Sequence, residues 1–454
     1  MYLFSQMQLQ IRTLTGWWTK VQQYVVNKVL NRIFPYGIIY HPGQLAVIKR
    51  SLLSETSLIF LPVLQSSLDT IVIQRLLSYQ FGLPTLSVKT SNQPTKISST
   101  WSRFDGAFSN GTLQLVPSSE QLTSDLAWAV QQEVIQSLLE DKNNFLLPLQ
   151  PYKTNHETVK RWEQCQFLSS LVEVLYSNDS SVMDISIVPM AISYDIKLED
   201  LSESSKKTSI LNKVFKGWAF LTKILYPGSK GCGRARIDFD QPFSLLDFMK
   251  NTEKNCVKTE EYNAEAVTQN LYNHILWNSF NLRRFSACDI YSFAKHNRPN
   301  IDLPETFQKV TTDIRAKHRD LTFMGAPNAV VSYASTISNN LYLERNIYND
   351  VIQIYLGEMI ISAAICALLK TTAIDCYKGT HAQVIVGSKE DLLEEAKLLL
   401  DLVEYEFPLV APPCKDSNEY FLMESLDNFL GKTFEYLRVG FLNQTTSITM
   451  NLSL

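Results

Sequence analysis

The chain has 454 residues, a formal net charge of -3, 45% hydrophobic residues and 19% charged residues. This length allows two or three domains with a sizeable core, and the composition excludes an intrinsically disordered chain. The slightly negative charge argues against general nucleic-acid binding. The seven cysteines occur singly, without a CxxC pair or a zinc-type spacing, so we expect no metal site.

The charge is unevenly distributed, because residues 1–54 contain no Asp or Glu but six Lys and Arg side chains. We therefore expect this basic, aromatic segment to contact an anionic lipid surface. Residues 16–34 have the apolar spacing of a helix, which Pro35 ends. One apolar row of this helix consists of Trp18, Val21, Val25, Val29 and Ile33. Packing on the protein body and lying in a membrane interface both remain open for it.

Residues 56–255 alternate between short apolar runs and amphipathic segments. The apolar runs predict strands at residues 58–64, 85–88, 145–149, 185–192 and 235–239. The segments between them predict helices at residues 69–78 and 123–141. Strands separated by helices of this length predict an α/β fold whose sheet is mainly parallel and flanked by helices.

After residue 255, helical patterns dominate. Residues 351–369 form the most apolar stretch and are just long enough to span a bilayer. Because Glu358 lies near its middle, we favour a buried core helix over a membrane-embedded one, and both readings stay open. Residues 388–403 predict an amphipathic helix. We therefore divide the chain into a basic amphipathic N-terminal segment (1–55), an α/β domain (56–255) and a helical C-terminal domain (256–454).

Five sequence blocks occur in an order that matches a known enzyme family. They read KVLNRIFPYGIIYHPGQLAVIKRS (28–51), IFLPVLQSSLD (59–69), SIVPMAISYD (186–195), RIDFDQPFSL (236–245) and FPLVAPPCKD (407–416). Together they resemble the animal mitochondrial glycerol-3-phosphate acyltransferases. The resemblance implies an acyltransferase-type sheet, acyl-CoA as co-substrate with no other cofactor, and a place at the mitochondrial outer membrane. It also implies that this chain is a shortened member.

The family reaction joins a glycerol-3-phosphate hydroxyl to the acyl group of acyl-CoA, so a base must take the hydroxyl proton. The family pattern is His followed five residues later by Asp, across a strand–turn–helix bend. Here the block reads Leu64-Gln-Ser-Ser-Leu-Asp69, which keeps the Asp as the catalytic-site candidate and replaces the His by leucine. Asp69 is either a remnant of that pair or an acid favoured in the first turn of a helix. None of the six histidines has an acid five residues on.

Two further family blocks have also lost polar residues. The second block aligns with Gly106 and Phe108, which the resemblance makes substrate-binding candidates, and has Asn110 and Gly111 at its two arginine positions. The third block, residues 145–150, has lost the Glu, Gly and Arg that help to hold the phosphate in the family. Gln150, at the arginine position, has neither the charge nor the paired donors.

The fourth block, residues 187–195, is intact and largely apolar, so Pro189 is a candidate for packing the acyl chain. Arg236 and Asp238 alternate with apolar residues, which favours a half-solvated strand face over a ligand site. The losses together indicate a catalytically inactive family member that binds lipid, acyl-CoA or a protein partner at a membrane surface. The alternatives are an active acyltransferase with a non-standard base, and a helical scaffold that shares only ancestry with the family.

Overall fold

The computed structural model places most of the strands and helices of the chain. It describes residues 9–10, 17–52, 56–66, 68–83, 85–90, 111–115, 132, 135–137, 139–149, 166–177, 184–198, 231–256, 264–297, 302–338, 349–372, 382–404, 422, 425 and 447–452. Two compact units are present: residues 1–151 with 158–347, and residues 152–157 with 348–454. The predicted boundaries at residues 55 and 255, and a separate helical domain after residue 255, stay predictions.

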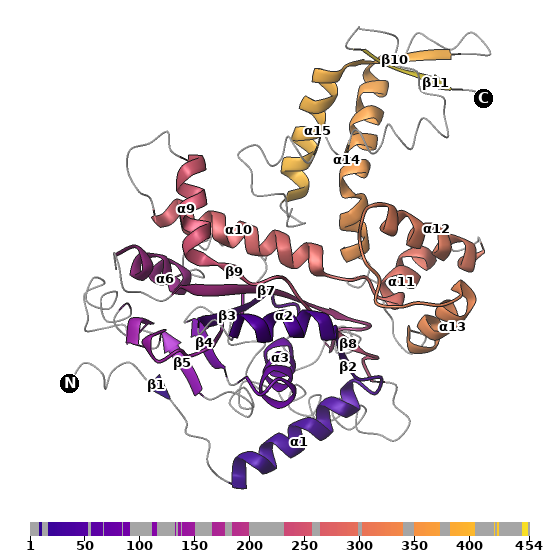
Figure 1. Ribbon diagram of the computed structural model, residues 1–454. Helices are drawn as coiled ribbons and strands as arrows, with labels where there is room; N and C mark the ends of the chain where they lie inside the picture. Colours follow the sequence, from indigo (N-terminus) through magenta and orange to yellow (C-terminus); the bar gives the residue numbers. More distant parts are fainter. Residues whose placement is uncertain are drawn as a thin grey trace, which may run out of the picture. The chain divides into compact units, whose positions relative to one another are not determined.

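The first unit contains a mixed sheet of mostly parallel strands (Figure 1). Its strands lie in the order β1 (Leu9–Gln10), β5 (Gly111–Leu115), β4 (Leu86–Thr90), β6 (Phe145–Leu146), β3 (Ser57–Pro62), β7 (Ile185–Tyr194), β8 (Ala235–Phe239) and β2 (Ile38–Tyr40), while β9 (Phe243–Ser244) also pairs with β7. The strands from β5 to β7 run parallel, and β8 and β9 run antiparallel to β7. The expectation of a mainly parallel sheet is confirmed.

The predicted strands begin and end close to the observed ones because their apolar runs are buried on both sides. Every residue of β3 is buried, and β8 spans the predicted residues 235–239. β6 is shorter than expected, and beyond it an isolated bridge joins Leu149 to Val63. Much of the predicted helix at residues 123–141 lies outside the described residues. Within it, Ile135 and Leu139 are buried, which fits an amphipathic segment.

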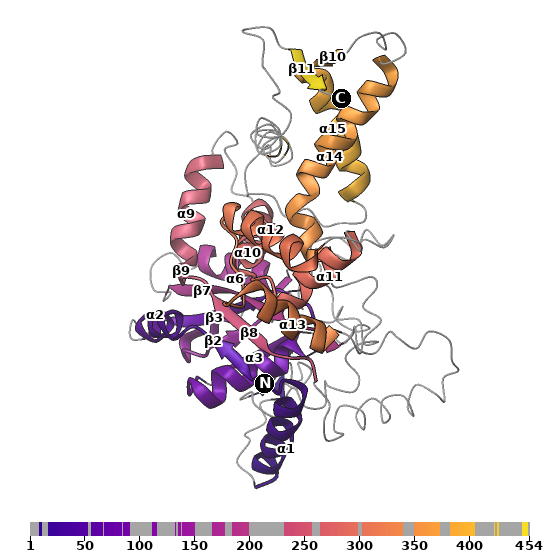
Figure 2. The same cartoon turned by 90° about the vertical axis from the view of Figure 1, so that its right-hand side faces the viewer.

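Helices cover both faces of the sheet (Figures 1 and 2). The helices of the first unit are α1 (Trp17–Ile33), α2 (Pro42–Leu52), α3 (Asp69–Arg75), the π-helical turn η2 (Leu76–Gln80), α6 (Gln166–Ser177), α9 (Leu245–Cys256), α10 (Ala264–Leu282), α11 (Ala287–Asn297), α12 (Leu303–Ala316) and α13 (Pro327–Ser338). α10 packs against β7, α6 and α9, whereas α1 and α3 share a core with the opposite face. That core takes alternate residues of β7, including Val188, Met190 and Ile192, as a two-residue strand period requires.

The buried face of α1 overlaps the predicted apolar row only at its end, where Ile33 is buried and Val29 is partly buried against the core. The helix itself is confirmed, but Val26, Leu30 and Ile33 face the core, while Val21 and Val25 are exposed. α1 has two adjoining apolar rows, and the body of the protein covers only one of them. Periodicity finds an apolar helix face but cannot tell which of two adjacent rows will be packed.

The second unit contains α14 (Asn349–Thr372), α15 (Lys389–Glu404) and a two-stranded sheet of β10 (Ala382–Ser388) and β11 (Ser447–Leu452), which the sequence did not predict. One face of α14 packs with α15 through Ile361, Ala364 and Leu392, as the core-helix alternative predicts. In the described parts of the chain, no helix combines the length and apolarity needed to cross a bilayer. The shared core gives residues 351–369 a covered apolar face within the protein.

Candidate functional site

The bend predicted from the first family block is present between β3 and α3. Leu64 follows β3 and is half-buried, and its backbone N–H donates to the carbonyl of Leu149 at 2.7 Å. Asp69 lies in the first turn of α3 and is completely buried. Its Oδ2 accepts hydrogen bonds from the backbone N–H groups of Gln65 at 2.5 Å and Ser66 at 3.0 Å. The Asp69 carboxylate therefore fixes the turn that begins directly after Leu64.

The second oxygen of Asp69 is held by the fourth family block. The hydroxyl of Tyr194, at the end of β7, donates to Asp69 Oδ1 at 2.5 Å. The Tyr194 ring stacks on Phe34 with the ring centroids 5.6 Å apart. The acid thus receives neutral donors on both oxygens. This arrangement fits a structural helix-start acid, and it equally fits a remnant that would orient a base at position 64.

The described histidines make their contacts elsewhere. His41 Nδ1 accepts a hydrogen bond from the backbone N–H of Gly43. His274 contacts Asn278 and the ring of Phe243, and burial lowers its pKa below the ordinary value. His156, His381 and the side chain of His296 lie outside the described residues. Leu64 itself can neither accept a proton nor form a side-chain hydrogen bond.

The structure brings the third family block beside the first. Leu147 N–H donates to the carbonyl of Phe60 at 3.0 Å, and Leu149 N–H donates to that of Pro62 at 2.8 Å. Leu147 and Leu149 are both buried. Gln150, at the family's arginine position, lies outside the described residues. Within the described part of the block, buried leucines stand beside the end of β3.

The second family block contributes little that the structure describes. Gly106, Phe108 and Asn110 lie outside the described residues, so their predicted roles stay predictions. Gly111 begins β5 and pairs with Leu86, which is in register with Phe145 and, through it, with Ile59. Ile59 of β3 lies five residues before Leu64, which follows that strand, so Gly111 is offset from Leu64 by about 16 Å along the strand direction.

Pro189, the predicted packing residue of the fourth block, is buried in the middle of β7. It is in register with Leu61 of β3, and its carbonyl accepts a hydrogen bond from Asp240 N–H at 2.9 Å. Asp240 lies where β8 ends and before β9 begins, so β7 needs no donor from residue 189 at this gap. A proline therefore fits this otherwise central strand. Its role towards an acyl chain stays a prediction.

A second buried acid, Asp195, follows β7. Its side chain is 1% exposed, and Oδ2 accepts hydrogen bonds from the backbone N–H and Nε of Arg234 and from the Tyr333 hydroxyl at 2.7 Å. Oδ1 is buried and has no hydrogen-bond partner in the described parts of the chain. Burial raises the pKa of Asp195 above its ordinary value although Arg234 opposes the shift. Gly233 leaves room for this side chain, because a Cβ there would lie 2.7 Å from Asp195 Cβ.

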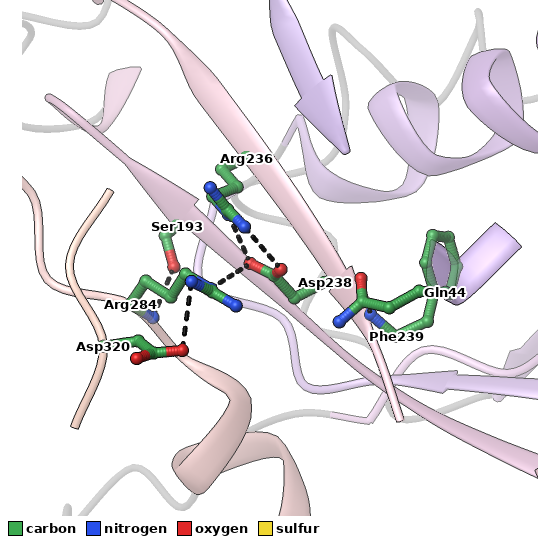
Figure 3. A network of polar contacts seen from close by, with 7 residues as sticks. All are labelled: Gln44, Ser193, Arg236, Asp238, Phe239, Arg284 and Asp320. Carbon is green, nitrogen blue, oxygen red and sulfur yellow. Dashed lines mark hydrogen bonds and ion pairs between the residues drawn. The ribbon is translucent and has the colours of Figure 1, made fainter. Parts of the chain in front are cut away.

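A third buried acid, Asp238, lies between two arginines (Figure 3). Arg236 binds it through Nε at 2.8 Å and Nη2 at 3.1 Å. Arg284, from the segment between α10 and α11, places Nε 3.2 Å from Asp238 Oδ2 and Nη1 3.0 Å from Asp320 Oδ2. The backbone N–H of Arg284 also donates to Ser193 Oγ of β7 at 3.0 Å.

The prediction of a half-solvated strand face is therefore wrong for Asp238, whereas the side chain of Arg236 remains 15% exposed. Asp238 is 1% exposed because the segment that carries Arg284 packs over this part of β8. Sequence reasoning missed Tyr194 as the partner of Asp69, Tyr333 as that of Asp195, and Arg284 as that of Asp238. The one local signal was the pair of adjacent arginines at residues 283–284, after a helix.

Comparison with known proteins links the chain to one group of enzymes. It is 23% identical over 474 residues to glycerol-3-phosphate acyltransferase 1, mitochondrial, of Sus scrofa, and 23% identical over 473 residues to the Homo sapiens protein. The Mus musculus protein is 22% identical over 474 residues. The chain is a distant relative of these acyltransferases. No family model matches it.

The matches to these acyltransferases cover 88% of this chain but 54% of each relative. The chain thus spans about half the length of the curated relatives it matches. The relationship agrees with the family that the sequence blocks indicated. The loss of activity and the shortening of the chain stay predictions from the sequence.

Proposed function

We propose that this chain is a catalytically inactive relative of the glycerol-3-phosphate acyltransferases of glycerolipid synthesis. In this proposal it binds acyl-CoA or lipid at a membrane surface and does not transfer the acyl group. The observation that carries the proposal is the bend after β3, where Leu64 stands five residues before the buried Asp69. Both carboxylate oxygens of Asp69 accept hydrogen bonds from Gln65, Ser66 and Tyr194.

The energetics of the reaction support the proposal. A hydroxyl is a weak nucleophile at neutral pH, and loss of its general base typically lowers the rate by about 10²–10⁴-fold. Loss of charged donors at a phosphate or transition-state clamp lowers it by roughly 10²–10³-fold for each donor. Leu64 removes the base, and Gln150 removes a charged donor. Although such losses are not simply additive, each of them is large, so the expected outcome is turnover close to background.

α1 supports the membrane part of the proposal. Val21, Tyr24 and Val25 are exposed on α1, and the ammonium of Lys28 lies 5.7 Å from the Tyr24 ring centroid. Apolar and aromatic side chains flanked by cations suit the surface of an anionic bilayer, where each cation contributes about 1 kcal/mol. The names of the relatives contain the word mitochondrial, which favours a mitochondrial membrane as that surface, and the family resemblance implies the outer one.

Vesicle sedimentation tests this part. The natural chain should bind vesicles that contain anionic lipid, and Lys20→Gln with Lys28→Gln should weaken binding by roughly 30-fold. Lys309→Gln, which removes an exposed cation from α12, is the matched control and should leave binding unchanged. Equal weakening by both variants would show that α1 is not the contact.

A second candidate function is an active acyltransferase with a non-standard base, and one observation favours it. Asp195 follows Tyr194, the partner of Asp69, and its pKa is raised by burial. Its Oδ1 has no hydrogen-bond partner in the described residues. A carboxylate with a raised pKa is a suitable base, but Asp195 is so deeply buried that a substrate would reach it only after Tyr333 moved away. If this candidate is right, Asp195→Asn should abolish transfer.

A transfer assay tests the proposal. Release of coenzyme A from acyl-CoA is measured with and without glycerol 3-phosphate, for the natural chain and for Leu64→His combined with Gln150→Arg. We expect background release from the natural chain and a gain of about 10²-fold from the double variant. Release by the natural chain that depends on glycerol 3-phosphate and exceeds background would refute the proposal.

A further inference from the structure

Arg236 and Arg284 belong to a connected group of charges that has more cations than anions. We call this group, which consists of Arg236, Asp238, Arg283, Arg284, Arg319 and Asp320, the arginine network. It contains four guanidinium groups and two carboxylates. Burial, with a smaller contribution from the nearby charge of Arg283, lowers the pKa of Arg319 to about 10, and Asp320 opposes the shift.

Each of the two arginines that flank Asp238 has guanidinium N–H donors that no described residue accepts. Arg236 uses Nε and Nη2 on Asp238, and Arg284 uses Nε on Asp238 and Nη1 on Asp320. Arg236 Nη1 and Arg284 Nη2 have no partner among the described residues. The two side chains are 15% and 22% exposed, so solvent reaches them although Asp238 is buried. Two adjacent guanidinium groups with free amino donors are a typical arrangement for binding a phosphate.

The two carboxylates hold Arg284 with unequal strength. Asp238 is 1% exposed, so its charge is costly to leave unpaired, and it fixes the arginines in place. Asp320 is 66% exposed, and an ion pair of that kind contributes about 0–1 kcal/mol. An incoming anion could therefore replace Asp320 on Arg284 at little cost, whereas Asp238 would stay.

The strand register places the arginine network near the bend after β3. Asp238 pairs with Ala191, and the preceding residue of β7, Met190, pairs with Pro62 at the end of β3. Asp238 is therefore level with Val63, two strands away, which is a separation of about 10 Å. Ligands of open α/β sheets bind outside the carboxyl ends of the parallel strands, and this is the carboxyl end of β3.

We propose that Arg236 and Arg284 form a binding site for a phosphate monoester dianion, which replaces the Asp320 carboxylate on Arg284. The inference rests on the proposed binding function, because glycerol 3-phosphate and coenzyme A each carry a phosphate monoester. The dianion would bring the charge of the arginine network from +2 to neutral while Asp238 remains bound to both arginines.

Calorimetric titration tests the site with inorganic phosphate as the probe. Arg284→Gln should weaken phosphate binding by roughly tenfold, because it removes a charged donor pair. Asp320→Asn should tighten binding by about threefold, because it removes the competing carboxylate. Lys309→Gln and Glu305→Gln alter an exposed pair on α12 by the same charges and are the matched controls, for which we expect no change. Unfolding curves show whether each variant is folded.

The variants with opposite expected effects separate a binding site from a purely structural network. If Asp320→Asn, a change at an exposed side chain, leaves phosphate affinity unchanged or matches Glu305→Gln, the inference is overturned. Titrations with glycerol 3-phosphate, coenzyme A and dephospho-coenzyme A then identify the source of the monoester, since the last compound lacks it. An unchanged affinity of Arg284→Gln for inorganic phosphate would overturn the site, while acyl-CoA binding by the natural chain would leave the proposed function standing. Phosphate binding without acyl-CoA binding would support the site and count against the proposed function.

Discussion

Two regions near the carboxyl end of β3 hold a buried carboxylate in different ways. The Asp69 carboxylate accepts hydrogen bonds from two backbone N–H groups and a tyrosine hydroxyl, all of them neutral donors. Asp238 is held by two guanidinium groups that also reach solvent and an exposed acid. The first arrangement closes a turn, whereas the second leaves cationic donors accessible. The comparison indicates that the bend has kept its structural role, while the capacity to bind an anion lies on β8 and the segment after α10.

The largest expected effect tests the charged region. Asp238→Ala leaves Arg236 and Arg284 without their shared buried partner, so we expect the free energy of unfolding to fall by about 3–5 kcal/mol. Asp320→Ala removes the exposed partner of the same Arg284 and should change it by less than about 1 kcal/mol. Urea unfolding measures both. Similar losses for the two variants would contradict the unequal roles of these acids.

The next effect tests the neutral region. Asp69→Ala leaves two backbone N–H groups and the Tyr194 hydroxyl unpaired in a buried place, so a loss of about 2–4 kcal/mol is expected. Asp289 of α11 provides a matched control because it accepts a hydrogen bond from Ser286 N–H in the same way but is half-buried. Asp289→Ala should cost about 1 kcal/mol in the same unfolding experiment. Equal losses of unfolding free energy for Asp69→Ala and Asp289→Ala would contradict the claim that the buried Asp69 stabilises the fold more than a half-buried acid at a helix start.

A smaller effect isolates the link between the first and fourth family blocks. Tyr194→Phe removes the hydroxyl that donates to Asp69 but keeps the ring that stacks on Phe34. We expect a loss of about 1–2 kcal/mol in the free energy of unfolding. Tyr40→Phe also removes one hydroxyl and keeps an aromatic contact, here with Phe81, and should be nearly neutral. A neutral Tyr194→Phe would mean that the two backbone donors alone hold Asp69.

The buried Asp195 should make the free energy of unfolding depend on pH. Its pKa is raised by burial above the ordinary value of 3.8, so the folded protein binds its proton more tightly than the unfolded chain does. Stability contributed by this proton is complete below pH 3.8 and is lost as the pH rises through the folded-state pKa, at up to about 1.4 kcal/mol per pH unit. Asp195→Asn should lack this fall. Urea unfolding of both proteins from pH 4 to 8 measures the difference, and parallel pH profiles would contradict the assignment.

Sequence patterns predicted the frame of the sheet but not its polar connections. β3, β7 and β8 follow from apolar runs, because strands buried on both faces can hold few other residues. The contact between Asp69 and Tyr194 joins positions 125 apart, and that between Ser193 and Arg284 joins positions 91 apart. Local periodicity contains no information on such distant pairs. The buried row of α1, with Val26 and Leu30, was missed for a related reason, since the choice between two apolar rows depends on the surface that meets them.

The bend at Leu64 was predictable because the family pattern fixes its spacing. Asp69 kept its place there, and residues 145–149 of the third block lie beside the end of β3. Arg284 has no family block to mark it, so its role emerged only when β8 and the segment after α10 came together in space. Functional residues that lie within one bend can be recognised from the sequence. Functional residues that come from distant segments can be recognised only once the fold is known.

The most direct test of the account is a single-turnover experiment with the protein in excess over labelled acyl-CoA and with saturating glycerol 3-phosphate. Binding and chemistry are then followed in the same sample, by filtration for bound label and by quenching for acylated product. We predict that the label binds and is recovered as intact acyl-CoA. Conversion of the bound label to acylglycerol phosphate faster than the protein-free control would contradict the account, even if multiple turnovers are slow.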